Sequence, residues 1–237
     1  MKRVATIQSS YIPWKGYFDI IHDVDLFIFL DDVQYTRNDW RNRNRVKSPD
    51  GPRWLTIPVG GKTDRLICEV RLPESDWAQD HYRVLCQYYG KAPFFEKYRP
   101  WLEEVYLGRT WTYLSELNQH LVTTIFKDFL GGTTEFRDSR EFASHGWKLE
   151  RLMDLLDKAG AGLYVSGPSA RDYIDPAAFK QAGIELVFKD YSGYPDYSQP
   201  YPPFSHQVTI LDLLLNVGPE SPYYVWGWRE TGSRPAH

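Results

Sequence analysis

The pattern of apolar and polar positions opens the chain with a strand, a helix and a second strand. Residues 4–8 and 26–30 are short continuous apolar runs, which are typical of strands buried on both faces. Between them, Pro13 suits the first turn of a helix whose apolar positions run from Phe18 to Val24. A strand, a helix and a strand within about 30 residues form a βαβ unit, and such a unit requires a parallel sheet.

The pattern changes after residue 40. Charged residues alternate over 41–47, turn-forming residues occupy 48–51, and apolar residues return over 54–59. This arrangement predicts a β-hairpin. Residues 67–72 predict one further strand.

The middle of the chain carries apolar residues three or four positions apart, the spacing of amphipathic helices. This spacing predicts helices over 76–89, 93–106 and 112–129, and Gly131-Gly132 ends the last of them. We interpret these helices as an insertion in the α/β fold or a cap on it.

The last third returns to an α/β pattern. The expected elements are a strand at 134–137, a helix at 148–159, a strand at 163–166, a helix from Asp175-Pro176 to Gly183, a strand at 184–188, and a helix at 208–216 followed by a Pro/Gly-rich tail. We therefore expect one α/β domain over residues 1–237, with a Rossmann-like, mostly parallel sheet flanked by helices. A β-hairpin segment at about 40–72 and a helical insertion at about 76–130 complete this prediction.

Composition narrows the function classes. The net charge is −3 and the sequence pI is about 6.1, which disfavours nucleic acid as the main partner. The two cysteines form no C-x-x-C pair, which excludes a thiolate zinc site and favours a reducing compartment. No signal-peptide core and no long apolar run is present, so we expect a cytoplasmic protein without a membrane span. The sequence carries no signal of oligomeric state.

The loop after the first strand is the first candidate for chemistry. In open α/β sheets, ligands bind beyond the carboxyl ends of the strands, where a helix N-terminus attracts anions. Lys15 could pair with phosphate there, and Gly16 would let a ligand approach closely. The position resembles the T/H-x-G-H loop of nucleotidylyltransferases, but Trp-Lys-Gly-Tyr replaces it and both histidines are missing. The alternative is an ordinary turn with packed rings. The candidate binding residues are Gln8, Tyr11, Trp14, Lys15, Gly16 and Tyr17.

Asp31 and Asp32 end the second strand, and together with His206 they are the catalytic candidates. The carboxylates could hold Mg²⁺, bind sugar hydroxyls or act as a general base. Neighbouring side chains of a strand point to opposite faces, so we expect only one of the two to face a pocket. The alternative is a solvated strand end. His206 lies in a loop rich in Tyr and Pro, and no His pair with metal-ligand spacing exists.

A row of cations follows in the predicted hairpin. Alternation places Arg41, Arg43, Arg45 and Lys47 on one face of the strand, and Asn42, Asn44 and Val46 on the other. Such a row repels itself unless an anion binds, and guanidinium groups match phosphate. We infer that these cations and Asn42 contact an anionic small molecule such as a nucleotide. The alternative is a solvent-facing edge strand guarded by charge.

A turn between a predicted strand and helix supplies the last candidates. Phosphate oxygens could meet hydroxyl, backbone and guanidinium groups there. The residues are Ser166, Gly167, Ser169 and Arg171. No Gly-x-Ser-x-Gly elbow exists, so a hydrolase nucleophile is not indicated.

These stretches, in this order, resemble the signatures of the WbqC-like protein family. The N-terminal signature comprises Gln8-x-x-Tyr11-x-Pro13-Trp14-x-Gly16-Tyr17-Phe18, Leu30-Asp31-Asp32-Val33-Gln34-Tyr35 and Trp40-x-Asn42-Arg43-Asn44-Arg45-Val46-Lys47. The C-terminal signature comprises Glu150-Arg151-Leu152, Tyr164-x-Ser166-Gly167-Pro168-Ser169-Ala170-x-Asp172-Tyr173 and Leu211-Asp212-Leu213-Leu214. One departure is Gly193-Tyr194-Pro195, where the family has His-Pro, and the role of that histidine would pass to His206.

The resemblance implies a place in the biosynthesis of O-antigen or other surface glycans. Our leading hypothesis is a transferase that adds an acyl or aminoacyl group to a nucleotide-linked or related sugar. Two alternatives stay open: a nucleotide-activating enzyme resembling nucleotidylyltransferases, and a non-catalytic binding or scaffold protein of a glycan assembly complex.

Overall fold

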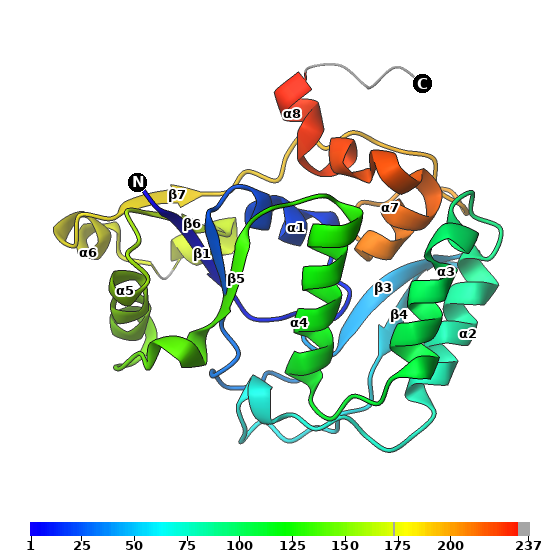
Figure 1. Cartoon of the computed structure of the whole chain (residues 1–237), viewed down its shortest axis with the longest axis horizontal. Coiled ribbons are helices and arrows are strands. Elements are labelled where there is room, and N and C mark those ends of the chain that lie inside the picture. Colours follow the sequence, from blue (N-terminus) through cyan, green and yellow to red (C-terminus); the bar gives the residue numbers. More distant parts are fainter. Residues whose placement is uncertain (173, 232–237) are drawn as a thin grey trace.

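A five-stranded parallel sheet forms the centre of the computed structural model, which describes residues 1–172 and 174–231 (Figure 1). The strands are β1 (Arg3–Ile7), β2 (Leu26–Phe29), β5 (Glu135–Asp138), β6 (Leu163–Ser166) and β7 (Glu185–Phe188), in the order β5-β2-β1-β6-β7. Each neighbouring pair is parallel. The α/β prediction is therefore confirmed, and the first and last thirds of the chain share one sheet.

The apolar runs of the central strands are continuous because both faces of the sheet are covered. Ala5 and Phe27 belong to one core cluster, and Val4 and Leu26 belong to the other. The first face packs against α1 (Lys15–His22), α4 (Leu114–Thr124) and α7 (Ile210–Val217). The second face packs against α5 (Lys148–Lys158) and α6 (Pro176–Gln181), which lie on the opposite side of the sheet in Figure 1. The result is a helix–sheet–helix arrangement.

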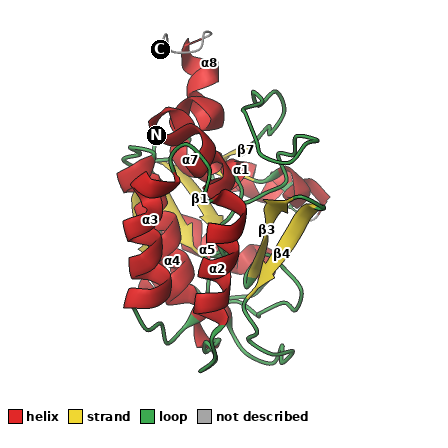
Figure 2. Ribbon diagram, turned by 90° about the vertical axis from the view of Figure 1, so that its right-hand side faces the viewer, coloured by secondary structure: helices red, strands yellow, loops and turns green. Residues whose placement is uncertain are grey.

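The predicted hairpin is present but lies outside the central sheet. Strands β3 (Arg43–Ser48) and β4 (Gly51–Thr56) form their own two-stranded antiparallel sheet. Figure 2 shows this hairpin beside α2 (Trp77–Tyr89). Gly51 has φ +103° at the turn, a conformation that favours glycine, and the Ser48 hydroxyl donates to its carbonyl at 2.7 Å.

The helical middle is confirmed with different ends. Helix α3 covers Phe95–Glu103, and π-helical turns extend α3 over Glu104–Gly108 and α4 over Ile125–Phe129. Gly131 follows with φ +70°.

The strand predicted at 67–72 was wrong. Ile67–Glu69 forms a 3₁₀ turn, flanked by the single bridges Gln34–Leu66 and Arg71–Tyr113. The Glu69 carboxylate accepts the backbone N–H of Leu66 at 2.8 Å and closes the turn. An apolar run of this length fits a strand or a buried turn equally well, and this local hydrogen bond decides between them.

The Pro/Gly-rich segment after α7 also differs from the expectation. It contains a π-helical turn, Tyr223–Gly227, and a short helix α8, Trp228–Thr231. Arg229 of α8 binds Asp19 of α1, and Glu230 lies 3.0 Å from the His22 Nε2. These contacts between distant parts of the chain hold the segment in a helical path.

Asp19 is the centre of this anchor. It is completely buried, accepts the Tyr194 hydroxyl at 2.5 Å and Arg229 Nη1 at 2.8 Å, and lies 2.9 Å from Lys189 Nζ. Two cations and a phenol thus compensate one buried carboxylate.

We expect Asp19→Asn to lower the free energy of unfolding by about 3 kcal/mol or more, because it leaves buried cations without their counter-charge. Urea denaturation measures this loss. The matched control is Asp154→Asn, which breaks the exposed ion pair with Lys158 and should cost far less. Equal denaturation midpoints for the two variants would contradict the central role of Asp19.

Candidate functional site

The candidate site lies at the carboxyl edge of the sheet, beside the point where the strand order reverses. The chain passes from β1 to β2 on one side, and β6 pairs with β1 on the other. Crevices at such switch points bind ligands in open α/β sheets. The loops that follow β1 and β2 carry Ser9 and Asp31 to this edge.

Asp31 is the best-fixed carboxylate of this edge. It is completely buried, its Oδ1 accepts the Ser9 backbone N–H at 2.8 Å, and its Oδ2 accepts Gln119 Nε2 at 2.8 Å. Burial raises the pKa of Asp31 although these hydrogen bonds act in the opposite direction. The carboxyl group therefore accepts a proton more readily than an exposed aspartate, in a fixed orientation.

Gln119 of α4 joins Asp31 to the neighbouring strand. The same Nε2 donates to Asp138 Oδ2 at 2.9 Å, at the end of β5. Arg140 holds Asp138 through Nε and Nη2, at 2.8 and 2.9 Å. The two carboxylates at the ends of adjacent strands are thus bridged by one amide.

Arg41 is the most unusual group of the site. It is 7% exposed, and its Nε and Nη1 are buried without a hydrogen-bond partner among the described residues. Its Nη2 lies 3.9 Å from Asp39 Oδ1, the far limit of an ion pair. Burying a guanidinium with unused donors is costly unless an acceptor binds it. A phosphate or carboxylate ligand would supply that acceptor.

The charges of Asp31 and Arg41 both act on Tyr17. Burial raises the pKa of Tyr17, the charge of Asp31 raises it further, and the charge of Arg41 lowers it. Asn118 completes the group, because its Nδ2 donates to the Arg41 carbonyl at 2.8 Å and to Ser9 Oγ at 3.4 Å. Its Oδ1 is buried and unpaired in the part of the chain that the structure describes.

The cationic row does not form the uniform face that alternation predicted. Arg41 precedes β3, so only the later members follow the strand. Arg43 and Arg45 stack on the ring of Trp54, at 4.2 and 4.8 Å from its centroid. Lys47 is buried and donates to the Pro203 carbonyl. Sequence periodicity could not show that the loop containing Pro203 covers the end of this strand.

Part of the repulsion in this row is relieved by Asp39. Burial disfavours its charge, yet Arg41, the Thr36 hydroxyl, the Trp40 N–H and Arg43 together lower its pKa. The Nε atoms of Arg43, Arg45 and Arg65 are buried without partners among the described residues, like that of Arg41. This region therefore has more guanidinium donors than protein acceptors, and it fits an anion.

Aromatic side chains of the loop after β1 and of the start of α1 fill the space beside that loop. The Trp14 ring packs over Gly16 so closely that a Cβ there would lie 2.2 Å from it. Tyr17 donates its hydroxyl to the Gln8 carbonyl at 3.0 Å. The absence of a side chain at Gly16 therefore makes room for the Trp14 ring rather than for a ligand. The Trp-Lys-Gly-Tyr sequence packs as an internal turn and offers no substitute for the missing histidines.

Asp32 points to different partners from Asp31. It accepts the Ser139 hydroxyl at 2.5 Å and forms an ion pair with Arg151 of α5. Arg151 Nη1 also donates to the Asp32 carbonyl at 3.0 Å. The two carboxylates therefore diverge, as the strand geometry predicts, and Asp32 secures α5 to the sheet.

Three other predicted binding residues make structural contacts. Tyr11 is completely buried, and its hydroxyl lies 2.7 Å from both His81 Nδ1 and Tyr106 Oη. Asn42 Nδ2 donates to the Ile57 carbonyl at 2.8 Å. Arg171 is exposed and stacks on Phe188, at 4.9 Å from its centroid.

The turn after β6 keeps open space above it. Ser166 is buried and Ser169 is exposed. No atom lies within 4 Å of a Cβ built on Gly167 among the described residues, so a ligand could reach this backbone. Tyr173, which belongs to the same motif, lies outside the described residues.

Lys15 and His206 both lie beside the Tyr194 ring, which belongs to the loop between β7 and α7. Lys15 Nζ lies 4.7 Å from the Tyr194 centroid and donates to the Pro195 carbonyl at 3.3 Å. His206 Nε2 lies 3.2 Å from Asp196 Oδ1. Neither side chain forms a hydrogen bond or an ion pair with Asp31 or Arg41 among the described residues.

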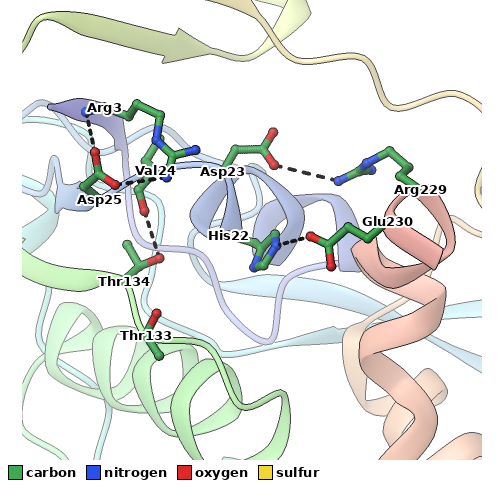
Figure 3. Close-up of a pocket in the computed structure, with 9 residues that line it drawn as sticks. All are labelled: Arg3, His22, Asp23, Val24, Asp25, Thr133, Thr134, Arg229 and Glu230. Atoms are coloured by element: carbon green, nitrogen blue, oxygen red, sulfur yellow. Dashed lines mark hydrogen bonds and ion pairs between the residues drawn. The ribbon is translucent and has the colours of Figure 1, made fainter. Parts of the chain in front are cut away.

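Two cavities lie at opposite edges of the sheet. One of about 530 Å³ borders the Asp31 group, because Cys68 lines it and donates its backbone N–H to the Asp31 carbonyl at 2.9 Å. Its other lining residues are Glu69, Arg71, Tyr113, Ser115, Glu116 and Arg140. The other, of about 570 Å³, lies at the amino edge (Figure 3). Its charged residues pair with one another, as in Arg3–Asp25 and His22–Glu230.

Four residues of this group are not among those predicted from the sequence: Asn118, Gln119, Asp138 and Arg140. A signal existed for Asn118, which lies four residues after Leu114 and three before Leu121 and so falls on the apolar side of the helix. Asp138 directly follows the strand predicted at 134–137, as Asp31 follows its own strand. The same reasoning could have placed Asp138 at the carboxyl edge.

The described residues contain neither a metal-binding cluster nor a membrane-spanning helix. Among the described residues, no three His, Cys, Asp or Glu side chains gather in a group suited to a metal ion. Within the same ranges, 1–172 and 174–231, no helix has the length and apolar character needed to cross a bilayer. Cys68 and Cys86 are both free thiols.

Comparison with known proteins identifies a family. The model of the WbqC-like protein family matches residues 8–224. The "Uncharacterized protein Rv1507c" of Mycobacterium tuberculosis (strain ATCC 25618 / H37Rv) is 45% identical over 227 residues, which is 95% of this chain and 98% of the relative. No solved structure matches the chain.

The buried Tyr11–His81 contact predicts a pH effect on stability. Burial lowers the pKa of His81 from 6.5 to about 4, so the folded protein holds it neutral. The unfolded chain binds a proton at higher pH, so stability is present above about 6.5 and is lost as the pH falls toward 4. The loss is about 1.4 kcal/mol per pH unit, or roughly 3 kcal/mol in all.

Urea denaturation between pH 4 and 7.5 measures this loss. His81→Gln removes the titrating group, so the difference in unfolding free energy between wild type and variant should shrink as the pH falls. A difference that is constant with pH would show that His81 is not held neutral.

Proposed function

The chain belongs to the WbqC-like protein family, and on that premise we propose that it is a transferase acting on a nucleotide-linked or related sugar in surface-polysaccharide biosynthesis. The transferred group would be an acyl or aminoacyl group. The buried, incompletely paired guanidinium of Arg41 at the carboxyl edge carries this proposal.

The electrostatics support an anionic donor or acceptor molecule. Arg41, Arg43 and Arg45 each keep a buried Nε without a partner among the described residues. A diphosphate offers several acceptor oxygens to such donors, and arginine binds phosphate bidentately. The indoles of Trp40 and Trp54 are 41% and 38% exposed, with ring centroids 5.2 Å apart, and the ring surface that Arg43 and Arg45 leave uncovered offers apolar contact to a base or a sugar.

Asp31 supports a proton-transfer role. Transfer of an acyl group to a sugar requires removal of a proton from the attacking hydroxyl or amine. Asp31 has a raised pKa and a fixed orientation, and Asn118 links its partner Ser9 to the Arg41 backbone. The Asn118 Oδ1, buried and unpaired within the described ranges, would orient a hydroxyl or amine next to it. In this proposal Gln119 and Ser9 position the base.

Isothermal titration with UDP-, dTDP- and GDP-sugars tests the anion site. We expect one of these classes to bind with 1:1 stoichiometry, and Arg41→Met to weaken its affinity about tenfold to 150-fold. This range corresponds to the loss of about 1.5–3 kcal/mol for hydrogen bonds to a charged group.

Arg83→Met is the matched control, because Arg83 is exposed on α2 and pairs with Asp80. This variant should bind like wild type. Absence of binding by all three classes at millimolar concentration, or equal affinities for the Arg41 and Arg83 variants, would overturn the proposed site.

A further inference from the structure

The two cavities of the structure differ in how their charges are used. At the amino edge, every ionisable side chain of the lining lies 3.8 Å or less from an ionisable partner (Figure 3). In the carboxyl-edge cavity of about 530 Å³, Arg140 is paired with Asp138. Among the described residues, however, no oppositely charged group lies within 4.0 Å of Glu69, Arg71 or Glu116. The carboxyl-edge cavity therefore keeps charges of both signs available to a ligand.

The two glutamates are held by the backbone through one oxygen each. Glu69 Oε2 accepts the Leu66 N–H at 2.8 Å, and Glu116 Oε2 accepts the Tyr113 N–H at 3.1 Å. In both side chains, Oε1 accepts no hydrogen bond from a described residue. The bond through Oε2 restricts each carboxylate, so a charged oxygen is offered to the cavity from a fixed position.

Arg71 is positioned by Tyr113. Its Nη2 donates to the Tyr113 hydroxyl at 3.1 Å, and the guanidinium lies 5.0 Å from the centroid of that ring. The backbones of the two residues form an antiparallel bridge, next to which the Leu114 N–H donates to the Val70 carbonyl at 2.8 Å. Within the described ranges, Nη2 is the only atom of this guanidinium that donates a hydrogen bond. A cation with unused donors thus lines the cavity on a fixed backbone.

Ser115 is the buried member of the lining. It is 2% exposed, and its hydroxyl makes no hydrogen bond with a described residue. A buried hydroxyl needs a partner, which a ligand in the cavity would supply. Gln119 lies four residues later on α4 and therefore on the same side of the helix. Because Gln119 donates to Asp31, this side of α4 connects the cavity with the proposed base.

The composition of the lining disfavours a hydrocarbon chain. Of its seven residues, four are charged, and the others are Cys68, Tyr113 and Ser115. An alkyl chain binds by burying apolar surface, and the largest apolar surface here, the Tyr113 ring, lies against the Arg71 guanidinium. A ligand with an ammonium group and carboxyl oxygens matches unpaired carboxylates and a guanidinium, because hydrogen bonds between charged groups are the strong ones.

We propose that the carboxyl-edge cavity binds the amino-acid end of a substrate, with its α-ammonium group at Glu69 and Glu116 and its carboxyl oxygens at Arg71. Ser115 adds a hydrogen bond to these oxygens from the first turn of α4, where a helix favours negative charge. This inference rests on the proposed function, which leaves open whether the transferred group is acyl or aminoacyl, and it selects the aminoacyl group.

Protection of the Cys68 thiol tests the ligand class. Cys68 lines the cavity, so a bound molecule covers it, whereas Cys86 on α2 lies outside the lining and is an internal control. The full-length protein is incubated with each standard amino acid except cysteine and is then alkylated with iodoacetamide. Mass spectrometry measures the rate at each thiol. We expect an amino acid at about four times its Kd to slow Cys68 about fivefold and to leave Cys86 unchanged.

Matched ligands and variants identify the groups that bind. The analogue of the protecting amino acid that lacks the amino group should bind about tenfold more weakly or worse. The double variant Glu69→Gln/Glu116→Gln keeps the oxygens that accept the backbone N–H groups but removes both charges, and it should weaken amino-acid binding to a similar extent. Ser115→Ala should weaken it about twofold to tenfold. The control is Glu96→Gln, which changes an exposed glutamate of α3 and should bind like wild type.

Three outcomes would overturn the inference. One is that no amino acid protects Cys68. Another is that the analogue without the amino group, or hexanoate, protects equally well, which would assign the cavity to a plain acyl group. The third is equal amino-acid affinity of the double glutamine variant and Glu96→Gln. Failure of the proposed function is distinguishable, because it would leave Cys68 protected by an amino acid while no nucleotide sugar binds.

Discussion

The carboxylate of Asp31 holds together three segments that are far apart in the sequence. Ser9 donates to it from the loop after β1, and Gln119 donates to it from α4, while Asp31 itself lies in the loop after β2. A buried carboxylate must be satisfied by donors, so these segments can pack only in an arrangement that supplies them. The position of α4 over the sheet, and with it Asn118 and the Arg41 backbone, follows from this requirement.

Buried charges in this protein fall into two classes with different meanings. Asp19 and Asp32 each have an arginine partner, and both secure a helix to the body of the fold. Arg41 and Lys15 have no comparable partner among the described residues. An unpaired buried charge costs several kcal/mol, so it is retained where something other than stability depends on it. The presence or absence of an ion-pair partner, more than the residue type, therefore distinguishes a buried charge that secures a helix from a candidate functional group.

The sheet and helices could be predicted from the sequence because their signals are local. The continuous runs of β1 and β2 reflect burial on both faces, and Asp31 follows from the end of its strand. The features that sequence reasoning missed depend on contacts between distant residues. Lys47 is buried by Pro203, and α8 is held by the Asp19 network. No periodicity within either segment records these partners. The packing of the loops also decides whether the predicted residues form one binding site, and the sequence pattern does not record that packing.

The start of α1 separates Lys15 from the candidate site around Asp31. Lys15 and Tyr17 are two residues apart, which on a helix turns their side chains roughly 200° from each other. Tyr17 lies toward Gln8, Asp31 and Arg41, and Lys15 lies toward the loop that carries Tyr194.

Trp14 and Tyr191 lie at this divide, with ring centroids 5.2 Å apart. Trp14 packs over Gly16, and Tyr191 is close enough to Tyr17 for its charge to act on the Tyr17 pKa. A ligand that contacts both Arg41 and Lys15 would therefore have to pass these two rings. Since Trp14 fills the space above Gly16, that passage requires the indole to move.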